Sequence, residues 1–257
     1  MNRPARKRFG QNFLIDQSVI RRIRDTVLPK NGELLIEIGP GRAAITAPLL
    51  EAGVEVMVVE IDRDLVADLE RRFAGNDQLR IFQSDALNTD FGELAQGQPY
   101  RLLGNLPYNI STPLIFHILD LQHQAVDMYF MLQKEVVNRM AAQPGNKNYG
   151  RLSIMVQNRC EVTSLFEVGP GCFDPKPKVE SGFISLRART EPLSGSTLLP
   201  ALDKVVRQAF SLRRKTLRNS LSSVMTSDQI IAAGIDPGLR AEQLELEQFF
   251  ALARQLN

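Results

Sequence analysis

The chain has 257 residues but contains only two cysteines and two histidines. It therefore has few of the thiol and imidazole side chains that bind transition metals, and few thiols to form disulfides. Cys160 and Cys172 are spaced neither as a pair of metal ligands nor as part of a disulfide framework, so we expect ordinary thiols of a reduced cytoplasm. His117 and His123 have no metal-ligand partners and no nucleophile motif beside them. We interpret both histidines as surface or packing residues and expect no metal site.

Long apolar segments are also missing. The N-terminal residues do not include the apolar region of a signal peptide, and no apolar run approaches the length of a membrane span. We therefore expect a cytoplasmic protein without a membrane partner. The length suits one large domain and one small one. A linker is predicted at Thr190–Thr197, with only helical patterns after it, so the predicted domains are residues 1–189 and 190–257.

A large net charge is absent as well, because the formal value is only +2. The basic residues are nevertheless concentrated in two segments, residues 1–24 and 203–218, each of which contains a single acidic residue. Basic clusters on a nearly neutral protein are typical of phosphate binding, although two solvated surfaces would give the same pattern. The clustered residues are Arg3, Arg6, Lys7, Arg8, Arg21, Arg22 and Arg24, and then Lys204, Arg207, Arg213, Arg214, Lys215 and Arg218.

A glycine-containing turn follows the first predicted strand of the large domain. The apolar strand from Leu34 leads into Gly39-Pro40-Gly41, and a helix follows through Leu50. Such glycines let the backbone approach a ligand, and the start of the helix offers free N–H groups. A dinucleotide fingerprint would place a third glycine at position 44, where the chain has Ala44. NAD binding is therefore disfavoured but not excluded, because a variant of the dinucleotide fingerprint has alanine in place of the third glycine.

Acidic side chains follow the next two predicted strands. The strand Val54–Ile61 carries Glu60 at its end, and an acidic residue about 20 positions after the glycine turn is where a ribose diol is bound. The strand Leu79–Gln83 is followed by Asp85. Open α/β sheets bind ligands at the C-terminal ends of their strands, so both carboxylates are predicted to face one site.

The fourth predicted strand stops at the elbow Asn105-Leu106-Pro107-Tyr108. The elbow presents a side-chain amide oxygen, a backbone carbonyl and an aromatic face, which suit a flat heterocycle with an exocyclic NH2 group. Pro107 removes a backbone donor and stiffens the turn. An ordinary strand end with a surface tyrosine would show the same four residues. Polar groups after four successive strands, however, indicate a common binding edge.

Further elements are predicted before and after these four strands. An amphipathic helix covers Ser18–Leu28, and a helix after the elbow has Ser111 or Thr112 as its N-cap and Pro113 at its first position. Three more strands are predicted, at Ala125–Leu132, Cys160–Val168 and Gly182–Arg187. In the C-terminal part, Thr226 and Gln229 form a predicted capping box, with Gly234 as the C-cap of that helix.

At this point the sequence resembles the class I S-adenosylmethionine-dependent methyltransferases, and three further segments narrow the resemblance. These are Gly10–Leu14, the loop Phe173–Ser181 with its F-x-P-x-P-K-V-x-S pattern, and Phe210–Asn219 with its R-R-K-T-L-R-N pattern. Together, and in this order, they are similar to motifs of the KsgA-type ribosomal RNA adenine dimethyltransferases. One departure is Ala43, where many relatives have glycine. We expect it to alter loop packing and not function.

The resemblance implies an α/β fold with a Rossmann-like seven-stranded sheet and a small all-α C-terminal domain. It also implies S-adenosylmethionine as the methyl donor and a monomer without a metal. The expected substrate is a pair of adjacent adenines, modified at N6, near the 3′ end of 16S rRNA in the small ribosomal subunit or its precursor. The implied cofactor-binding residues are Asn12, Leu14, Gly39, Gly41, Glu60, Ile61, Asp85, Ala86 and Asn105.

The expected chemistry follows from the elbow. The amide oxygen of Asn105 and the carbonyl of Leu106 accept the two N–H bonds of the adenine amine, so that its lone pair can point at the methyl group. Tyr108 and Phe173 stack on the base. The expected catalytic residues are therefore Asn105, Leu106, Pro107, Tyr108 and Phe173. The residues expected to contact rRNA phosphates are Arg6, Lys7, Arg8, Arg213, Arg214, Lys215 and Arg218.

Three alternatives remain open from the sequence. The nearest is the related enzyme that methylates 23S rRNA and confers antibiotic resistance, which the segments Phe173–Ser181 and Phe210–Asn219 disfavour. The second is a non-catalytic assembly factor of the small subunit. Intact Glu60, Asp85 and Asn105 argue against it. A nicotinamide oxidoreductase is the third, and calorimetry of cofactor binding would separate it.

Overall fold

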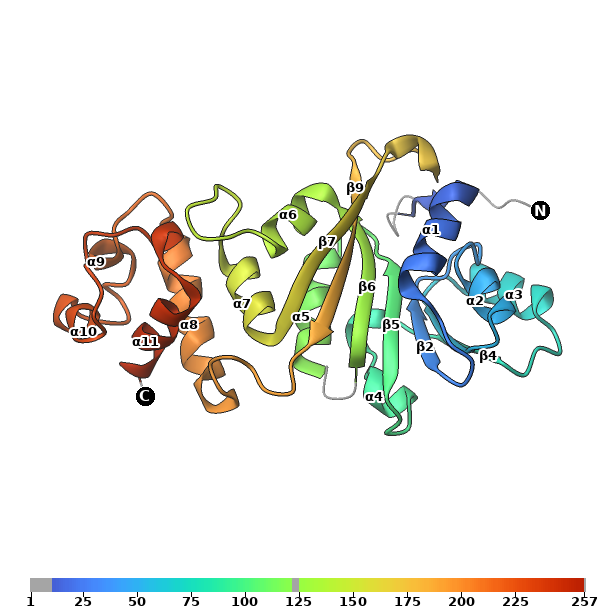
Figure 1. The fold of residues 1–257 in the computed structure, drawn as a ribbon, viewed down its shortest axis with the longest axis horizontal. Helices are drawn as coiled ribbons and strands as arrows, with labels where there is room; N and C mark the ends of the chain where they lie inside the picture. The colour runs from blue at the N-terminus through green and yellow to red at the C-terminus, as the bar shows by residue number, and fades with distance from the viewer. Residues whose placement is uncertain (1–10, 122–124, 257) are drawn as a thin grey trace. The chain divides into compact units, whose positions relative to one another are not determined.

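The structure is a computed structural model that describes residues 11–121 and 125–256. The chain forms two compact units, one extending to Val137 and including Thr163–Ala188, the other made of Asn138–Val162 and the chain from Arg189 onwards (Figure 1). The C-terminal part of the second unit begins at Arg189, one residue before the predicted linker Thr190–Thr197, and the unit also takes in residues 138–162. The predicted domains 1–189 and 190–257 remain a prediction.

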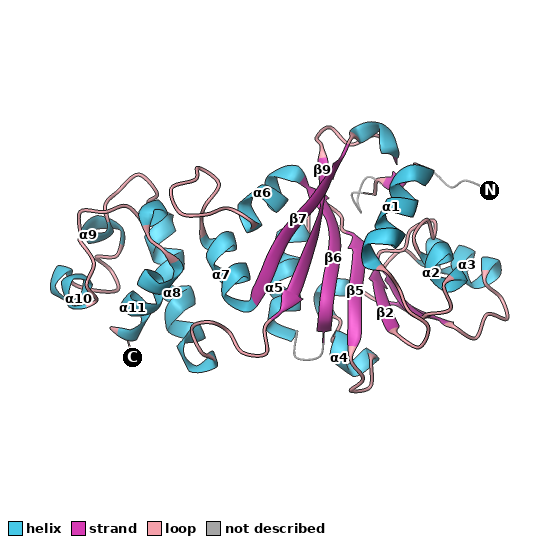
Figure 2. Ribbon diagram, viewed as in Figure 1, coloured by secondary structure: helices cyan, strands magenta, loops and turns pink. Residues whose placement is uncertain are grey.

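Strands and helices alternate along most of the first unit (Figure 2). Its strands, including β7 which continues into the second unit, are β1 Phe13–Leu14, β2 Leu34–Ile38, β3 Glu55–Glu60, β4 Leu79–Gln83, β5 Tyr100–Asn105, β6 Ala125–Gln133, β7 Cys160–Val168, β8 Phe173–Asp174 and β9 Ser181–Ala188. Its helices are α1 Gln17–Val27, α2 Thr46–Glu51, α3 Arg63–Arg72, α4 Phe91–Leu94, α5 Ser111–Leu121 and the start of α6 Lys134–Met140.

Within the described residues, seven strands form one sheet in the order β4-β3-β2-β5-β6-β9-β7. The strands β2 to β6 pair in parallel, and β9 pairs antiparallel with β6. The predicted Rossmann-like α/β sheet is therefore confirmed. The strand order reverses between β2 and β5, and open parallel sheets bind ligands at the carboxyl ends of the strands beside such a point.

The central strands are buried on both faces, which explains their almost continuous apolar sequences. All five residues of β2 and all but the first of β3 are buried. Gly104 has a separate reason for lacking a side chain, because a Cβ at this position would lie 2.7 Å from the carbonyl oxygen of Ile38 in the adjacent β2. This glycine lets β5 approach β2 next to the predicted site.

Two local predictions need correction. The helix α5 already includes Ser111, so neither Ser111 nor Thr112 is its N-cap and Pro113 is not its first residue. Instead, the carbonyl of Ile110 accepts the first helical hydrogen bond from Leu114, and the Ser111 hydroxyl donates to the carbonyl of Tyr108. A tight turn after Pro107, closed by the N–H of Ile110, starts the helix earlier than the proline suggests.

A small second sheet, in which β1 pairs antiparallel with β8, was not predicted. Phe13 lies opposite Asp174, and Leu14 lies opposite Phe173. The N–H of Ile15 extends the pairing by donating to the carbonyl of Cys172 at 2.9 Å. Two-residue strands have too short an alternation to be detected by period. This pairing holds the segment 11–14 beside the ends of the main strands.

The second unit is mainly helical beyond Arg189. Its helices are α7 Arg151–Arg159, α8 Leu199–Ser211, α9 Leu217–Ser220, α10 Ser227–Ala232 and α11 Leu246–Arg254. The rings of Phe210 and Phe249 stack between α8 and α11, with their centroids 5.9 Å apart. The predicted capping box of α10 is confirmed by reciprocal hydrogen bonds between Thr226 and Gln229. None of the helices in the described part of the chain has the length and apolar character of a membrane span.

The cysteines and His117 have ordinary structural surroundings. Neither Cys160 nor Cys172 is part of a disulfide, and burial raises the pKa of Cys160 to about 12. The Nε2 atom of His117 lies 2.8 Å from the carbonyl oxygen of Thr89, and its ring packs edge-on against Phe91, as a packing residue does. His123 lies outside the described residues. Among those described, no group of three His, Cys, Asp or Glu side chains is arranged to hold a metal.

Candidate active site

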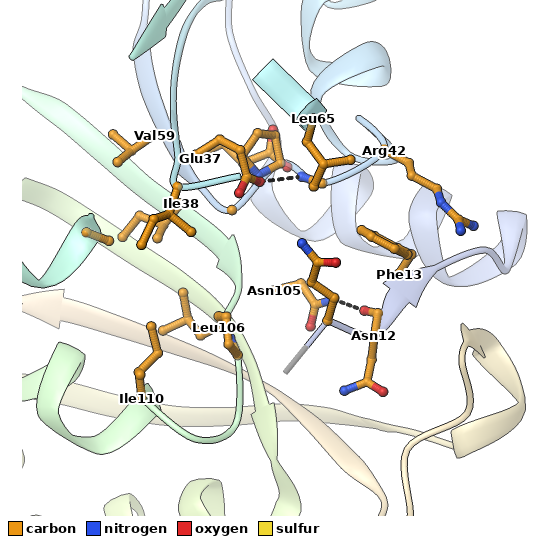
Figure 3. Close-up of a pocket in the computed structure, with 18 of the residues that line it drawn as sticks. Asn12, Phe13, Glu37, Ile38, Arg42, Val59, Leu65, Asn105, Leu106 and Ile110 are labelled. Atoms are coloured by element: carbon orange, nitrogen blue, oxygen red, sulfur yellow. Dashed lines mark hydrogen bonds between the residues drawn. The ribbon is translucent and has the colours of Figure 1, made fainter. Parts of the chain in front are cut away.

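A cavity of about 270 Å³ lies at the carboxyl ends of β2, β3, β4 and β5, and the segment 11–14 also borders it (Figure 3). It brings together residues that the sequence assigned to one site from five separate segments. The predicted residues that line it are Asn12, Leu14, Gly39, Gly41, Glu60, Ile61, Asp85, Ala86, Asn105, Leu106, Pro107 and Tyr108. Phe173 is not among its lining residues.

The turn from β2 to α2 depends on backbone conformations that favour glycine. Gly39, Gly41 and Ala43 have φ values of 66°, 55° and 60°. At Gly41 a Cβ would also lie 2.9 Å from Cδ1 of Phe13, so any side chain would displace the segment 11–14. Ala43 adopts the left-handed region without being glycine, which is strained for an L-residue. The glycine that the resemblance leads one to expect here would remove that strain.

Glu60 ends β3 with its carboxylate fixed by backbone donors. Its Oε1 accepts from the N–H of Asp62 at 2.9 Å, and its Oε2 accepts from the N–H of Gly41 at 3.3 Å. The residue is only 5% exposed, and burial raises the pKa of its carboxyl group. A carboxylate held in this way at the cavity can accept hydrogen bonds from a diol.

Glu37 is a site residue that the sequence reading did not select. It lines the cavity, is 2% exposed, and accepts a 2.6 Å hydrogen bond from the hydroxyl of Thr46. Burial, assisted by the charge of Glu60, raises its pKa to about 7. The available signal was a single acidic residue within the otherwise apolar strand Leu34–Ile38, because such a residue is buried only with a specific partner.

Asp85 follows β4 and completes a set of three carboxyl groups around the cavity. Its Oδ1 accepts from the N–H of Leu87 at 3.0 Å, which caps the short 3-10 turn Ala86–Asn88. The basic side chain that lines the cavity is Arg42, and its guanidinium pairs with Asp174 at 3.1 Å. The charges at this cavity therefore favour a cationic ligand over a pyrophosphate.

The side chain of Asn105 is oriented by a single contact. Its Nδ2 donates to the backbone carbonyl of Asn12 at 2.8 Å (Figure 3). A carbonyl can only accept, so the amide nitrogen must face Asn12 and the amide oxygen must face the other way. Because Asn105 lines the cavity, this arrangement provides an oriented acceptor at the elbow.

Tyr108 is held at the opposite end of the elbow. Its hydroxyl lies 2.6 Å from the hydroxyl of the fully buried Ser181, the last residue of the F-x-P-x-P-K-V-x-S segment. Burial raises the pKa of Tyr108. The ring is thus fixed at its polar end while Tyr108 lines the cavity.

The whole chain was compared with known proteins. Residues 2–257 match the family described as ribosomal RNA adenine dimethylase. The chain belongs to this family. Curated members named "Ribosomal RNA small subunit methyltransferase A" are similar over almost the full length. The protein of Hahella chejuensis is 52% identical over 97% of this chain and 92% of its own, and that of Methylococcus capsulatus is 48% identical over 100% of both.

Two solved structures have the same fold. A dimethyladenosine transferase from Plasmodium falciparum superposes with a TM-score of 0.79 at 25% identity, covering 93% of this chain and 95% of its own. The 23S rRNA methyltransferase ErmE superposes with a TM-score of 0.74, also at 25% identity, covering 95% of this chain and 99% of its own. The fold is therefore shared by a 23S rRNA methyltransferase and a dimethyladenosine transferase.

Phe173, which is predicted to stack on the target base, does not line the cavity. The residue is 1% exposed and packs in the hydrophobic core with Leu14, Ile20 and Phe183. Its pairing with Leu14 in the small sheet accounts for this burial. Stacking of Phe173 on a base stays a prediction, and in this structure its ring is occupied by core packing.

The basic residues predicted to contact RNA divide into three groups. Arg6, Lys7 and Arg8 lie outside the described residues. Arg213 is already engaged, because Nε donates to Glu242 at 3.0 Å and Nη2 donates to the carbonyl of Lys147. The exposed members in the second unit besides Arg213 are Arg214, Lys215 and Arg218.

Proposed function

We propose that this protein transfers methyl groups from S-adenosylmethionine to N6 of two adjacent adenines near the 3′ end of 16S rRNA. The observation that carries the proposal is the orientation of the Asn105 side chain. Its Nδ2 donates to the carbonyl of Asn12, and its amide oxygen remains an acceptor at the cavity. An acceptor fixed in advance is what an aromatic amine needs when it becomes the nucleophile.

The cavity residues fit S-adenosylmethionine as the donor. Glu60 would accept hydrogen bonds from the ribose hydroxyls, and Asp85 would accept from the adenine amine. Glu37 and Glu60 would favour the positively charged sulfonium of the donor, and they would disfavour the anionic pyrophosphate of a dinucleotide. When bound, S-adenosylmethionine supplies a methyl group on a sulfonium, a strong electrophile that requires no covalent intermediate on the protein.

The elbow would then position and activate the target amine. The oxygen of Asn105 and the carbonyl of Leu106 accept its two N–H bonds, which lets the nitrogen direct its lone pair at the methyl group. These hydrogen bonds strengthen as positive charge develops on nitrogen, so they favour the transition state over the ground state. Tyr108, tethered through Ser181, offers its ring for stacking on the base.

The relatives' names support the small subunit as the substrate. The curated proteins that are about half identical to this chain are named as methyltransferases of the small ribosomal subunit's RNA. The 23S rRNA methyltransferase ErmE is only 25% identical. An rRNA substrate of this kind implies a cytoplasmic enzyme, and we propose that it acts as a monomer. Adenines within an A-form helix are inaccessible, so the target is expected in an unpaired loop of the subunit.

The direct test is to incubate the protein with S-adenosylmethionine and small-subunit or large-subunit particles that lack the modification, and to map methylated adenines by mass spectrometry. We expect two adjacent N6-dimethyladenosines in 16S rRNA. Modification of 23S rRNA alone would contradict the substrate. Tight binding to small-subunit particles without any methyl transfer would favour a non-catalytic assembly factor.

Replacement of Glu60 by alanine is expected to weaken S-adenosylmethionine binding by about 1–3 kcal/mol, because buried hydrogen-bonding groups lose their partner. The matched control is Glu55→Ala at the start of the same strand, outside the cavity lining. Isothermal calorimetry on folded variants measures both. Unchanged affinity in Glu60→Ala would refute the assignment of this carboxylate to the cofactor.

A triple variant in which Arg214, Lys215 and Arg218 become alanine is expected to bind small-subunit particles more weakly and with a shallower dependence on salt. Each lost phosphate contact should reduce the slope of log affinity against log salt concentration by about 0.9. Affinity for S-adenosylmethionine should stay the same. The exposed Arg254→Ala serves as the control for a general change of charge in the second unit. Identical slopes for the triple variant and the wild type would place the docking surface elsewhere.

A further inference from the structure

Arg42 connects three segments around the cavity without belonging to the elbow. Its Nη1 atom forms an ion pair with Asp174 at 3.1 Å, and its guanidinium carbon lies 4.2 Å from the centroid of the Phe13 ring. Phe13 and Asp174 are direct cross-strand partners in the β1–β8 sheet. One arginine therefore contacts both members of a pair that no local sequence pattern indicates. Figure 3 shows the side chains of Arg42 and Phe13 next to each other.

The Phe13 ring also lies close to the glycine turn between β2 and α2. Gly41 lies so close to this ring that a Cβ would approach Cδ1 to 2.9 Å. Phe13 thus has the backbone of Gly41 and the guanidinium of Arg42 as neighbours, and it is almost fully buried. The backbone of Arg42 is held in turn, because Arg72 donates to its carbonyl at 2.9 Å.

The segment that Arg42 holds is the one that orients Asn105. Asn12 precedes Phe13 directly, and its carbonyl accepts the 2.8 Å hydrogen bond from Nδ2 of Asn105. A shift of β1 away from the cavity would remove this acceptor and free the amide to rotate. Small displacements of a catalytic group cost rate because the reacting geometry is lost.

We propose that Arg42 is a positioning residue, which holds the segment Asn12–Leu14 against the cavity through Phe13 and Asp174 and thereby orients the amide of Asn105. This inference rests on the proposed methyl transfer for its effect on rate. Its structural part concerns only the β1–β8 pair. The Arg42 side chain is 21% exposed and the Asp174 side chain is 56% exposed, and neither residue belongs to the buried core.

Two variants separate positioning from direct contact with a ligand. Arg42→Met removes the charge and keeps most of the side-chain volume. Asp174→Asn removes the ion pair from a residue that does not line the cavity, and it leaves the guanidinium in place. The control is Arg71→Met, which removes an exposed arginine of the same unit that pairs with Asp68 on α3.

The measurements are hydrogen exchange of the ligand-free protein over residues 12–15 and single-turnover methyl transfer at saturating S-adenosylmethionine and particles. For Arg42→Met we expect exchange to become about tenfold faster and the methyl-transfer rate to fall about tenfold, since an ion pair and a cation–π contact are lost together. Asp174→Asn should shift both quantities in the same direction by a smaller factor. Arg71→Met should change neither.

Three results would overturn the proposal. Unchanged exchange and rate in Arg42→Met would show that the contacts do not hold the segment. A slower reaction in Arg42→Met with a normal Asp174→Asn would show that Arg42 acts by touching a substrate. Faster exchange with a normal rate would show that the segment does not position Asn105. If the wild type fails to methylate small-subunit particles, the proposed function fails, while the exchange measurement still decides whether Arg42 holds β1.

Discussion

Replacement of Asn105 by alanine is expected to reduce the rate of methyl transfer by about 100- to 1,000-fold, the usual effect of removing one oriented group that stabilises developing charge. The substitution removes the amide oxygen that accepts from the target amine. It also removes the hydrogen bond from Nδ2 to the carbonyl of Asn12. Particle binding should remain largely normal, because the contact with the target amine strengthens chiefly in the transition state. Single-turnover kinetics at saturating substrates measure the rate, and equilibrium binding measures the affinity for the particle.

Asn31→Ala is the matched control, because Asn31 is exposed in a turn of the same unit and does not line the cavity. Its rate should equal that of the wild type. A folded Asn105→Ala variant with a nearly normal single-turnover rate would contradict the mechanism, since another group would then have to activate the amine.

Glu37 is expected to make the ligand-free protein less stable as the pH rises. Burial raises the pKa of this carboxyl from 4.5 to about 7, so the favourable contribution of the protonated form is complete below pH 4.5 and is lost as the pH rises through about 7. Glu37→Gln keeps an acceptor for Thr46 and cannot ionise. At pH 8 the variant should therefore be more stable than the wild type by about 3 kcal/mol, and at pH 4.5 the two should be nearly equal.

Urea unfolding at pH 4.5, 6 and 8 gives the free energies for this comparison. The exposed Glu51→Gln provides the control, because it changes the same net charge at the surface of the first unit. The difference between Glu37→Gln and wild type should grow with pH, whereas the difference for Glu51→Gln should stay small. A difference for Glu37→Gln that is independent of pH would mean that Glu37 is ionised at no cost in the folded protein.

The sheet and the binding edge could be predicted because their signals are local. The strand Leu34–Ile38 is buried throughout and apolar except for Glu37. The glycines after it indicate a turn that requires positive φ values. Glu60 ends β3 and Asp85 comes two residues after β4, and parallel strands bring their carboxyl ends to one edge. The Asn-Leu-Pro-Tyr elbow could be assigned in the same way. The predicted start of α5 was one or two residues too late, because a turn after Pro107 begins the helix at Ser111.

The sequence by itself therefore determined the α/β class, the family and which strand ends carry polar groups. Only the tertiary structure decided how those groups are held. Asn12 and Asn105 are 93 residues apart, and Arg42 and Asp174 are 132 residues apart. No period or turn signal connects such positions, because these contacts form only when the sheet and the β1–β8 pair bring the segments together. For the same reason the structure alone revealed that Glu37 faces the cavity with a raised pKa and that Phe173 packs in the core.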